Sequence, residues 1–182
     1  MTGVQTCALP ICVSIRGLDE LARRFGIMRG YEAWQAHGEW YQTVQPSLSP
    51  MVRDRLIACR EVNGAQYQDS FDFRLGLKTY MRSFLPADTA ILLPTTWSFA
   101  PLLESDSETM ALNRTRNIEL NSLASFCGLP QINIPFRTNE SDLVYGDKQQ
   151  YFGFSLVGAY GCDLPLIRLA QRLKRTLPEQ FL

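Results

Sequence analysis

Ser155, in the segment GFSLVG, is the residue whose surroundings come closest to a catalytic motif. The nucleophile elbow of serine hydrolases requires a glycine two residues before and two residues after the serine, because the strained turn leaves no room for a Cβ atom. Gly153 meets the first condition, but Val157 occupies the second position and Gly158 comes one residue late. More strand-forming residues follow, where an elbow would begin a helix. The pattern therefore predicts a structural strand rather than a nucleophile.

Few other residues could act as a catalytic base. His37 is the only histidine, so a Ser–His triad or a histidine metal site would have to use it. It lies between two tryptophans on a predicted helix, which is typical of a packed or half-exposed residue. The three lysines, Lys78, Lys148 and Lys174, have no neighbouring cation or apolar setting that would lower their pKa. We expect no catalytic residue, no metal site and no cofactor in this chain.

Two aromatic residues follow a predicted buried strand. The run TAILLP is short, continuous and apolar, as in strands that are covered on both faces. Its end would bring Trp97 and Phe99 to the carboxyl edge of a sheet, where ligands bind in open α/β proteins. Two aromatic side chains that cover the edge of a core would explain the same pattern.

The remaining periodicity predicts helices first and then strands that alternate with helices. Polar residues at 137–150 suggest a hairpin or surface excursion. This order indicates an α/β fold with a mixed sheet flanked by helices. The helices are expected at 18–28, 30–40, 49–62, 65–85, 107–127 and 163–177, and the strands at 89–94, 131–136 and 151–160.

Composition restricts the class of protein. The chain has 182 residues, 46% of them hydrophobic, which suits one soluble globular domain. Eighteen basic residues balance eighteen acidic ones, so nothing indicates direct binding to nucleic acid or to an anionic membrane. The cysteines show no zinc-binding spacing and suit reduced thiols, and no apolar run reaches membrane-spanning length. We expect a cytoplasmic protein.

The first residues differ from the rest. Met1 to Ile11 match, codon by codon, the translation of a common short-read sequencing adapter read from a GTG start, and Cys12 would be the junction. We therefore interpret residues 1–12 as an adapter-derived artefact and exclude them from the fold. The protein is expected to extend upstream of residue 13.

Three stretches occur in an order that resembles the C-terminal part of amidase signature hydrolases. They are ILLPTT…AP, FCGLPQINIP and YFGFSLVGAYGCDLPLIRLAQRL. That family shows a strand ending in Pro-Thr, a Gly-Leu-Pro before a strand ending in Pro, and a glycine-rich strand leading into the last helix. The helical stretch YEAWQAHGEW resembles the branch that contains the plant indole-acetamide amidase. The resemblance implies that residues 13–182 form the C-terminal part of a single amidase domain.

The same resemblance implies hydrolysis of an amide C–N bond by a Ser–Ser–Lys triad. In the family the serine pair lies in a Gly/Ser-rich segment toward the N-terminal half, with the lysine earlier still. This sequence contains no such segment and no suitably placed lysine. The triad would lie upstream, and the chain by itself is expected to be inactive.

In family members the helix before Gly-Leu-Pro runs past the substrate pocket. Spacing of three and four places Ile118, Asn121, Ser122 and Ser125 on one face of that helix, although close packing would also favour its small residues. Relatives that use glutamine have an acidic residue where Ile118 stands and a substrate-binding arginine near Arg55. A solvated arginine on a helix is the simpler interpretation of Arg55.

Three functions stay open on the sequence. The first is an amidase that acts on a small aromatic amide, for which Trp97 and Phe99 are the support. The second is the A subunit of a glutamine-dependent aminoacyl-tRNA amidotransferase, with two other subunits and charged tRNA as partners. The third is a non-catalytic binding or scaffold module. A small-molecule amide is the expected ligand, a homodimer is left open, and strands without neighbours would make the chain poorly soluble.

Overall fold

A computed structural model describes residues 17–137 and 151–176. The interpretation of residues 1–12 as adapter and the hairpin expected within 137–150 lie outside the described residues, apart from Arg137. The elements along the chain are α1 (Leu18–Val44), α2 (Pro50–Cys59), α3 (Gly64–Phe84), β1 (Ala90–Pro94), α4 (Ser107–Cys127), β2 (Gln131–Arg137), β3 (Tyr151–Gly158) and α5 (Asp163–Thr176).

The three described strands form one sheet in the order β1-β3-β2. Both pairings are antiparallel, with Leu93 and Asn133 lying on either side of Ser155. The sequence predicts a mixed sheet, and the described strands contain no parallel pair. The register fixes what each face carries, since side chains alternate along a strand. One face presents Thr95, Asn133 and Ser155, and the other presents Ile134 and Leu156.

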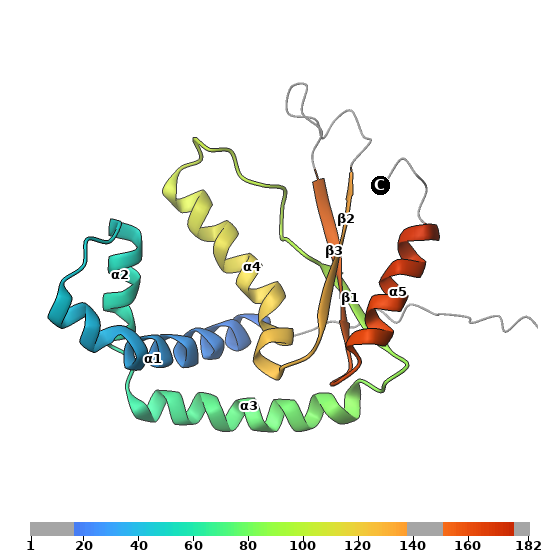
Figure 1. Cartoon of the computed structure of the whole chain (residues 1–182), viewed down its shortest axis with the longest axis horizontal. Coiled ribbons are helices and arrows are strands. Elements are labelled where there is room, and N and C mark those ends of the chain that lie inside the picture. Colours follow the sequence, from blue (N-terminus) through green and yellow to red (C-terminus); the bar gives the residue numbers. More distant parts are fainter. Residues whose placement is uncertain (1–16, 138–150, 177–182) are drawn as a thin grey trace, which may run out of the picture.

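The apolar face of the sheet packs against α5. Leu166 and Ala170 of the helix form a buried cluster with Ile134 and Leu156 of the strands. These two positions lie four residues apart, as expected for the apolar face of an amphipathic helix. Figure 1 shows α5 on one side of the sheet and α4 on the other.

A second core lies where α1, α3 and α4 meet. Phe126 is 2% exposed, and its ring stands edge-to-face to Phe25 with 6.3 Å between the ring centroids. Burial of such aromatic side chains is the largest favourable contribution that a small core can make. Figure 1 shows α1 and α3 crossing one end of the molecule, with α4 rising from them beside the sheet. The buried members of this core are Leu21, Met28, Met81, Leu85, Leu123, Phe126, Cys127 and Ala159.

The helix α4 begins and ends at the predicted positions. Asp106 is the residue before it, and its carboxylate accepts a hydrogen bond from the Thr109 N–H over 2.7 Å. This bond holds the pKa of Asp106 below its usual range. At the other end Gly128 adopts φ 68°, a left-handed conformation that favours glycine. The turn at Gly128 leads the chain directly into β2, which begins at Gln131.

The two consecutive helical stretches expected at 18–28 and 30–40 form a single helix, because α1 runs unbroken from Leu18 to Val44. Gly30 is buried inside α1, and a Cβ atom there would lie 3.5 Å from Val62. The packing of α1 against the chain around α2 therefore outweighs the weak helix propensity of glycine.

Candidate functional site

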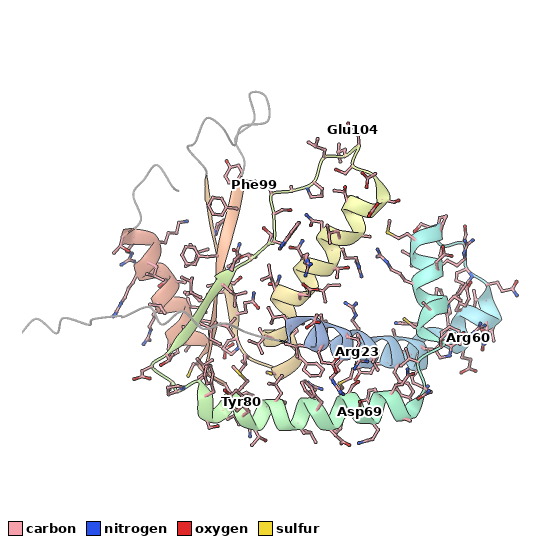
Figure 2. All side chains as sticks on the ribbon, turned by 180° about the vertical axis from the view of Figure 1, so that it is seen from behind. Arg23, Arg60, Asp69, Tyr80, Phe99 and Glu104 are labelled. Atoms are coloured by element: carbon pink, nitrogen blue, oxygen red, sulfur yellow. The ribbon has the colours of Figure 1, made fainter. Side chains whose placement is uncertain are left out.

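A hollow of about 370 Å³ opens where β1 ends, between the sheet and the first half of α4. Its walls come from the segment after β1, from α4, and from the ends of β2 and β3. Figure 2 shows Phe99 on the segment that joins β1 to α4, close to the sheet. The lining residues are Thr95, Thr96, Ser98, Phe99, Ala100, Pro101, Asn113, Asn117, Asn133, Pro135, Tyr151, Phe152 and Gly153.

Hydroxyl and amide groups from β2, from β3 and from the residue just after β1 meet behind this hollow. The Thr95 hydroxyl lies 2.6 Å from Asn133 Oδ1, to which it donates, and 2.9 Å from the Ser155 hydroxyl. Gln131 Nε2 donates to Ser155 Oγ over 2.9 Å and to Asn121 Oδ1 over 2.9 Å. Ser155 is fully buried, so its hydroxyl depends on these partners.

Asparagines on α4 extend the network toward the loop after β1. Asn121 Nδ2 donates to the carbonyl oxygen of Thr95 over 2.9 Å. One turn earlier, Asn117 Oδ1 accepts the Trp97 N–H over 2.8 Å, and Asn117 Nδ2 donates to Asn113 Oδ1 over 2.8 Å. These bonds give partners to the Thr95 carbonyl oxygen and the Trp97 N–H, which lie beyond the end of β1. They therefore hold in place the segment that carries Phe99.

Gly153 explains the glycine of the segment GFSLVG. A Cβ atom at this position would collide with Asn133 Oδ1 and would lie 3.1 Å from the Ile134 carbonyl oxygen. Gly153 also accepts the Thr95 N–H over 3.0 Å, which extends the pairing beyond β1. The glycine therefore makes room for the Asn133 side chain. Ser155 is a buried residue inside β3, as predicted, and not a nucleophile at a turn.

The described walls of the hollow carry hydrogen-bonding groups and aromatic rings but no charged side chain. Among the residues that the structure describes in this lining, none is a carboxylic acid, a lysine, an arginine or a histidine. Amide, hydroxyl and backbone groups supply hydrogen bonds, and the rings of Phe99 and Phe152 meet edge-to-face with 5.8 Å between their centroids. This mixture of apolar wall and few polar groups is typical of a small-molecule site.

Of the residues that the sequence singles out, Phe99 lines the hollow and Asn121 supports it. Trp97 is 52% exposed and takes part through its backbone N–H. Ile118 is half-buried and outside the lining, Ser122 is buried with its hydroxyl bonded to the Glu119 carbonyl oxygen over 3.3 Å, and Ser125 is exposed. The residues predicted to share one face of α4 therefore lie in different surroundings, and of these only Asn121 supports the hollow.

Arg55 lies away from the hollow, exposed on α2. Its surroundings are basic. The pKa of Arg114 on α4 is lowered, first by burial and then by the positive charges of Arg55 and of Arg29 on α1. The structure therefore places Arg55 with other arginines and not with Phe99.

Sequence reasoning overlooked Gln131, Asn133, Asn113 and Asn117. One signal was present, because asparagine recurs at intervals of four at 113, 117 and 121, which places three amides on one helix face. For Gln131 and Asn133 the alternation along β2 indicated a shared face. Nothing in the sequence showed that Ser155 and Thr95 lie opposite them.

His37, Lys78 and Lys174 are not among the residues that line the hollow, and Lys148 lies outside the described residues. His37 is exposed on α1, and Lys78 is half-buried on α3. In residues 17–137 and 151–176, no three histidine, cysteine or acidic side chains gather closely enough to hold a metal ion. No helix in the described part of the chain is both long and apolar enough to cross a membrane.

Comparison with known proteins gives amidases and proteins of the chloroplast outer envelope. No protein-family model matches the chain. It is 24% identical over 159 residues to the chloroplastic outer envelope protein 64 of Arabidopsis thaliana, covering 87% of this chain and 26% of that protein. It is 26% identical over 158 residues to Amidase 1 of Oryza sativa subsp. japonica, and the match covers 85% of this chain and 34% of that protein. The chain thus spans about a quarter to a third of the relatives it matches.

A solved structure agrees with these matches. The chain superposes on an amidase crystal structure with a TM-score of 0.74 and 25% sequence identity, covering 89% of this chain and 36% of the other. The α/β architecture expected from the sequence is confirmed. The chain therefore has the α/β fold of part of an amidase, and amidases are among the proteins that it resembles.

Proposed function

We propose that this chain is the substrate-binding, C-terminal part of an amidase that hydrolyses the C–N bond of a small carboxamide. The observation that carries the proposal is the superposition of 89% of the chain on 36% of an amidase structure. The similarity to rice Amidase 1 supports the same activity. The hollow beside Phe99 is the proposed place for part of the substrate.

The cleavage step is assigned to a Ser–Ser–Lys triad upstream of residue 13. Two observations support this assignment. The chain spans a minor share of its relatives, and the described lining of the hollow contains no group that could serve as a base. A serine activated through a lysine would attack the carbonyl carbon and expel the amine, and backbone N–H groups would stabilise the oxyanion.

An aromatic substrate is the preferred class within this proposal. Phe99 and Phe152 offer ring faces and edges at the hollow, and aromatic pairs in such geometry contribute about 0.5–1.5 kcal/mol beyond their buried area. Truncation of Phe99 to alanine should therefore lower kcat/KM for an aromatic amide more than for acetamide.

The test is a substrate panel on a protein that joins this chain to its upstream sequence. Release of ammonia is measured with an aromatic carboxamide, an aliphatic carboxamide and glutamine. The proposal expects hydrolysis of the simple carboxamides, with the aromatic one preferred. Turnover of glutamine alone would favour the amidotransferase subunit, and no turnover of any amide would favour the non-catalytic module.

A further inference from the structure

The side chain of Asn133 is held so that one end of its amide group faces the protein. Thr95 donates its hydroxyl hydrogen to Asn133 Oδ1. A hydroxyl carries one hydrogen, so Ser155 must be the donor in the 2.9 Å contact between Ser155 and Thr95. Gln131 in turn donates to Ser155. Gln131 therefore donates to Ser155, Ser155 donates to Thr95, and Thr95 donates to Asn133 Oδ1.

If the Asn133 amide were turned the other way, one of these hydrogen bonds could not form. Nδ2 would then donate to Thr95, and the Thr95 hydrogen would point to Ser155. The hydroxyl of Ser155 already accepts from Gln131, and it would lose the acceptor for its own hydrogen. Ser155 is fully buried, where an unpaired donor is costly. The network therefore selects the orientation with Oδ1 turned inward.

Asn133 Nδ2 is left with two N–H groups that have no partner among the described residues. The side chain is exposed and lines the hollow, and the absence of a Cβ atom at Gly153 lets it lie across β3. We infer that Asn133 is a specificity-determining residue that donates a hydrogen bond to the carbonyl oxygen of a neutral aromatic carboxamide bound in this hollow. This inference rests on the proposed amidase function.

The chemistry of the lining favours a neutral ligand over its acid. A carboxylate in the hollow would meet no counter-charge from the described lining, which contains no lysine, arginine or histidine. An amide carbonyl needs a donor, which Asn133 supplies, and the edge-to-face pair of Phe99 and Phe152 supplies an apolar wall for a ring. Benzamide combines both features and is the probe of choice.

The test measures benzamide binding to the 182-residue chain by calorimetry or by NMR titration. Asn133→Asp keeps an oxygen that accepts from Thr95 but removes both N–H donors and places a negative charge against the ligand carbonyl. We expect benzamide to bind about tenfold more weakly to this variant. Asn63→Asp is the matched control, because Asn63 accepts from Gln66 at the start of α3 and Asp preserves that bond. Its benzamide affinity should equal that of the unchanged chain.

A ligand series on the unchanged chain gives an answer that does not depend on how the variants fold. Benzoate, which carries a negative charge, and benzyl alcohol, which is neutral but lacks the carbonyl oxygen, should each bind about tenfold more weakly than benzamide. Equal binding of the three ligands would overturn the inference. So would benzamide binding that is unchanged by Asn133→Asp, or no binding of benzamide at all.

Failure of this inference can be told apart from failure of the proposed function. If the longer protein hydrolyses benzamide with the same kcat/KM whether residue 133 is Asn or Asp, the role of Asn133 is wrong and the amidase proposal stands. If benzamide binds through Asn133 but no carboxamide is hydrolysed, the inference stands and the amidase proposal is wrong.

Discussion

The hydroxyl groups of Thr95 and Ser155 lie 2.9 Å apart, one just beyond β1 and the other inside β3. This contact joins the end of an outer strand to the central strand of the described sheet. It also sets the direction of the hydrogen bonds that hold Asn133. The wall of the hollow and the interior of the sheet are therefore stabilised by the same side chains.

Replacement of Thr95 by valine should destabilise the chain by about 1–3 kcal/mol. The variant keeps the shape of the side chain but leaves the buried Ser155 hydroxyl without its acceptor. Urea denaturation followed by circular dichroism measures the change in the free energy of unfolding. Thr96→Val is the matched control, since Thr96 is exposed and donates to no residue of the network; an equal loss in both variants would contradict the prediction.

Two glycine-to-alanine changes should have opposite signs. Gly153→Ala brings a Cβ atom into Asn133 Oδ1 and the Ile134 carbonyl oxygen, and we expect a cost of about 1–3 kcal/mol. Gly76→Ala lies inside α3 with open space around it, so the better helix propensity of alanine should stabilise by up to about 1 kcal/mol. Thermal unfolding of both variants checks this. A Gly153→Ala protein as stable as the unchanged chain would show that Asn133 does not depend on this space.

The carboxylate of Glu20 should make stability depend on pH in acid. Hydrogen bonds from Arg23 and then Arg24 lower its pKa from 4.5 to about 2. The folded state therefore binds the proton less readily than the unfolded state, and the stabilising effect is complete above pH 4.5 and lost as the pH falls through about 2. In the Glu20→Gln variant the melting temperature should therefore change less with pH over this range.

Glu39 provides the control for this measurement, because it is exposed on the same helix and has no ion pair among the described residues. Glu39→Gln should keep the acid dependence of the unchanged chain. A Glu20→Gln protein with the same dependence as the unchanged chain would contradict the assignment to the Arg23 and Arg24 hydrogen bonds.

The thiol of Cys127 should react slowly with iodoacetamide. Burial raises its pKa to about 11, so little thiolate is present near pH 8. Cys59 and Cys162 are half-buried and serve as internal comparisons. Peptide mass spectrometry of the alkylated protein should find Cys127 modified last in the folded chain and at the same rate as the others in urea. Equal rates in the folded chain would contradict the burial of Cys127.

Local signals in the sequence were sufficient for most elements of the fold. The start of α4 at Ser107 and its end before Gly128 follow from capping chemistry, which depends on neighbouring residues alone. The apolar runs at 90–94 and 151–158 also form strands as predicted. The helical spacing at 18–28 and 30–40 is likewise confirmed by α1, which continues to Val44.

The candidate site was only partly predictable. Phe99 could be proposed because it follows an apolar strand, and strand ends carry ligands in many α/β proteins. Asn133 could not, because its role depends on the register that places it opposite Ser155 and on the room left by Gly153. Side-chain direction across strands is a long-range property, and a one-residue shift of register would turn Asn133 to the opposite face.

We propose that this chain binds a carboxamide whose cleavage depends on residues outside it. The most direct test is ammonia release from benzamide, measured side by side for the 182-residue chain and for the protein extended by its upstream sequence. We expect the extended protein to hydrolyse benzamide and the 182-residue chain to show no turnover. Turnover by the purified 182-residue chain would contradict it.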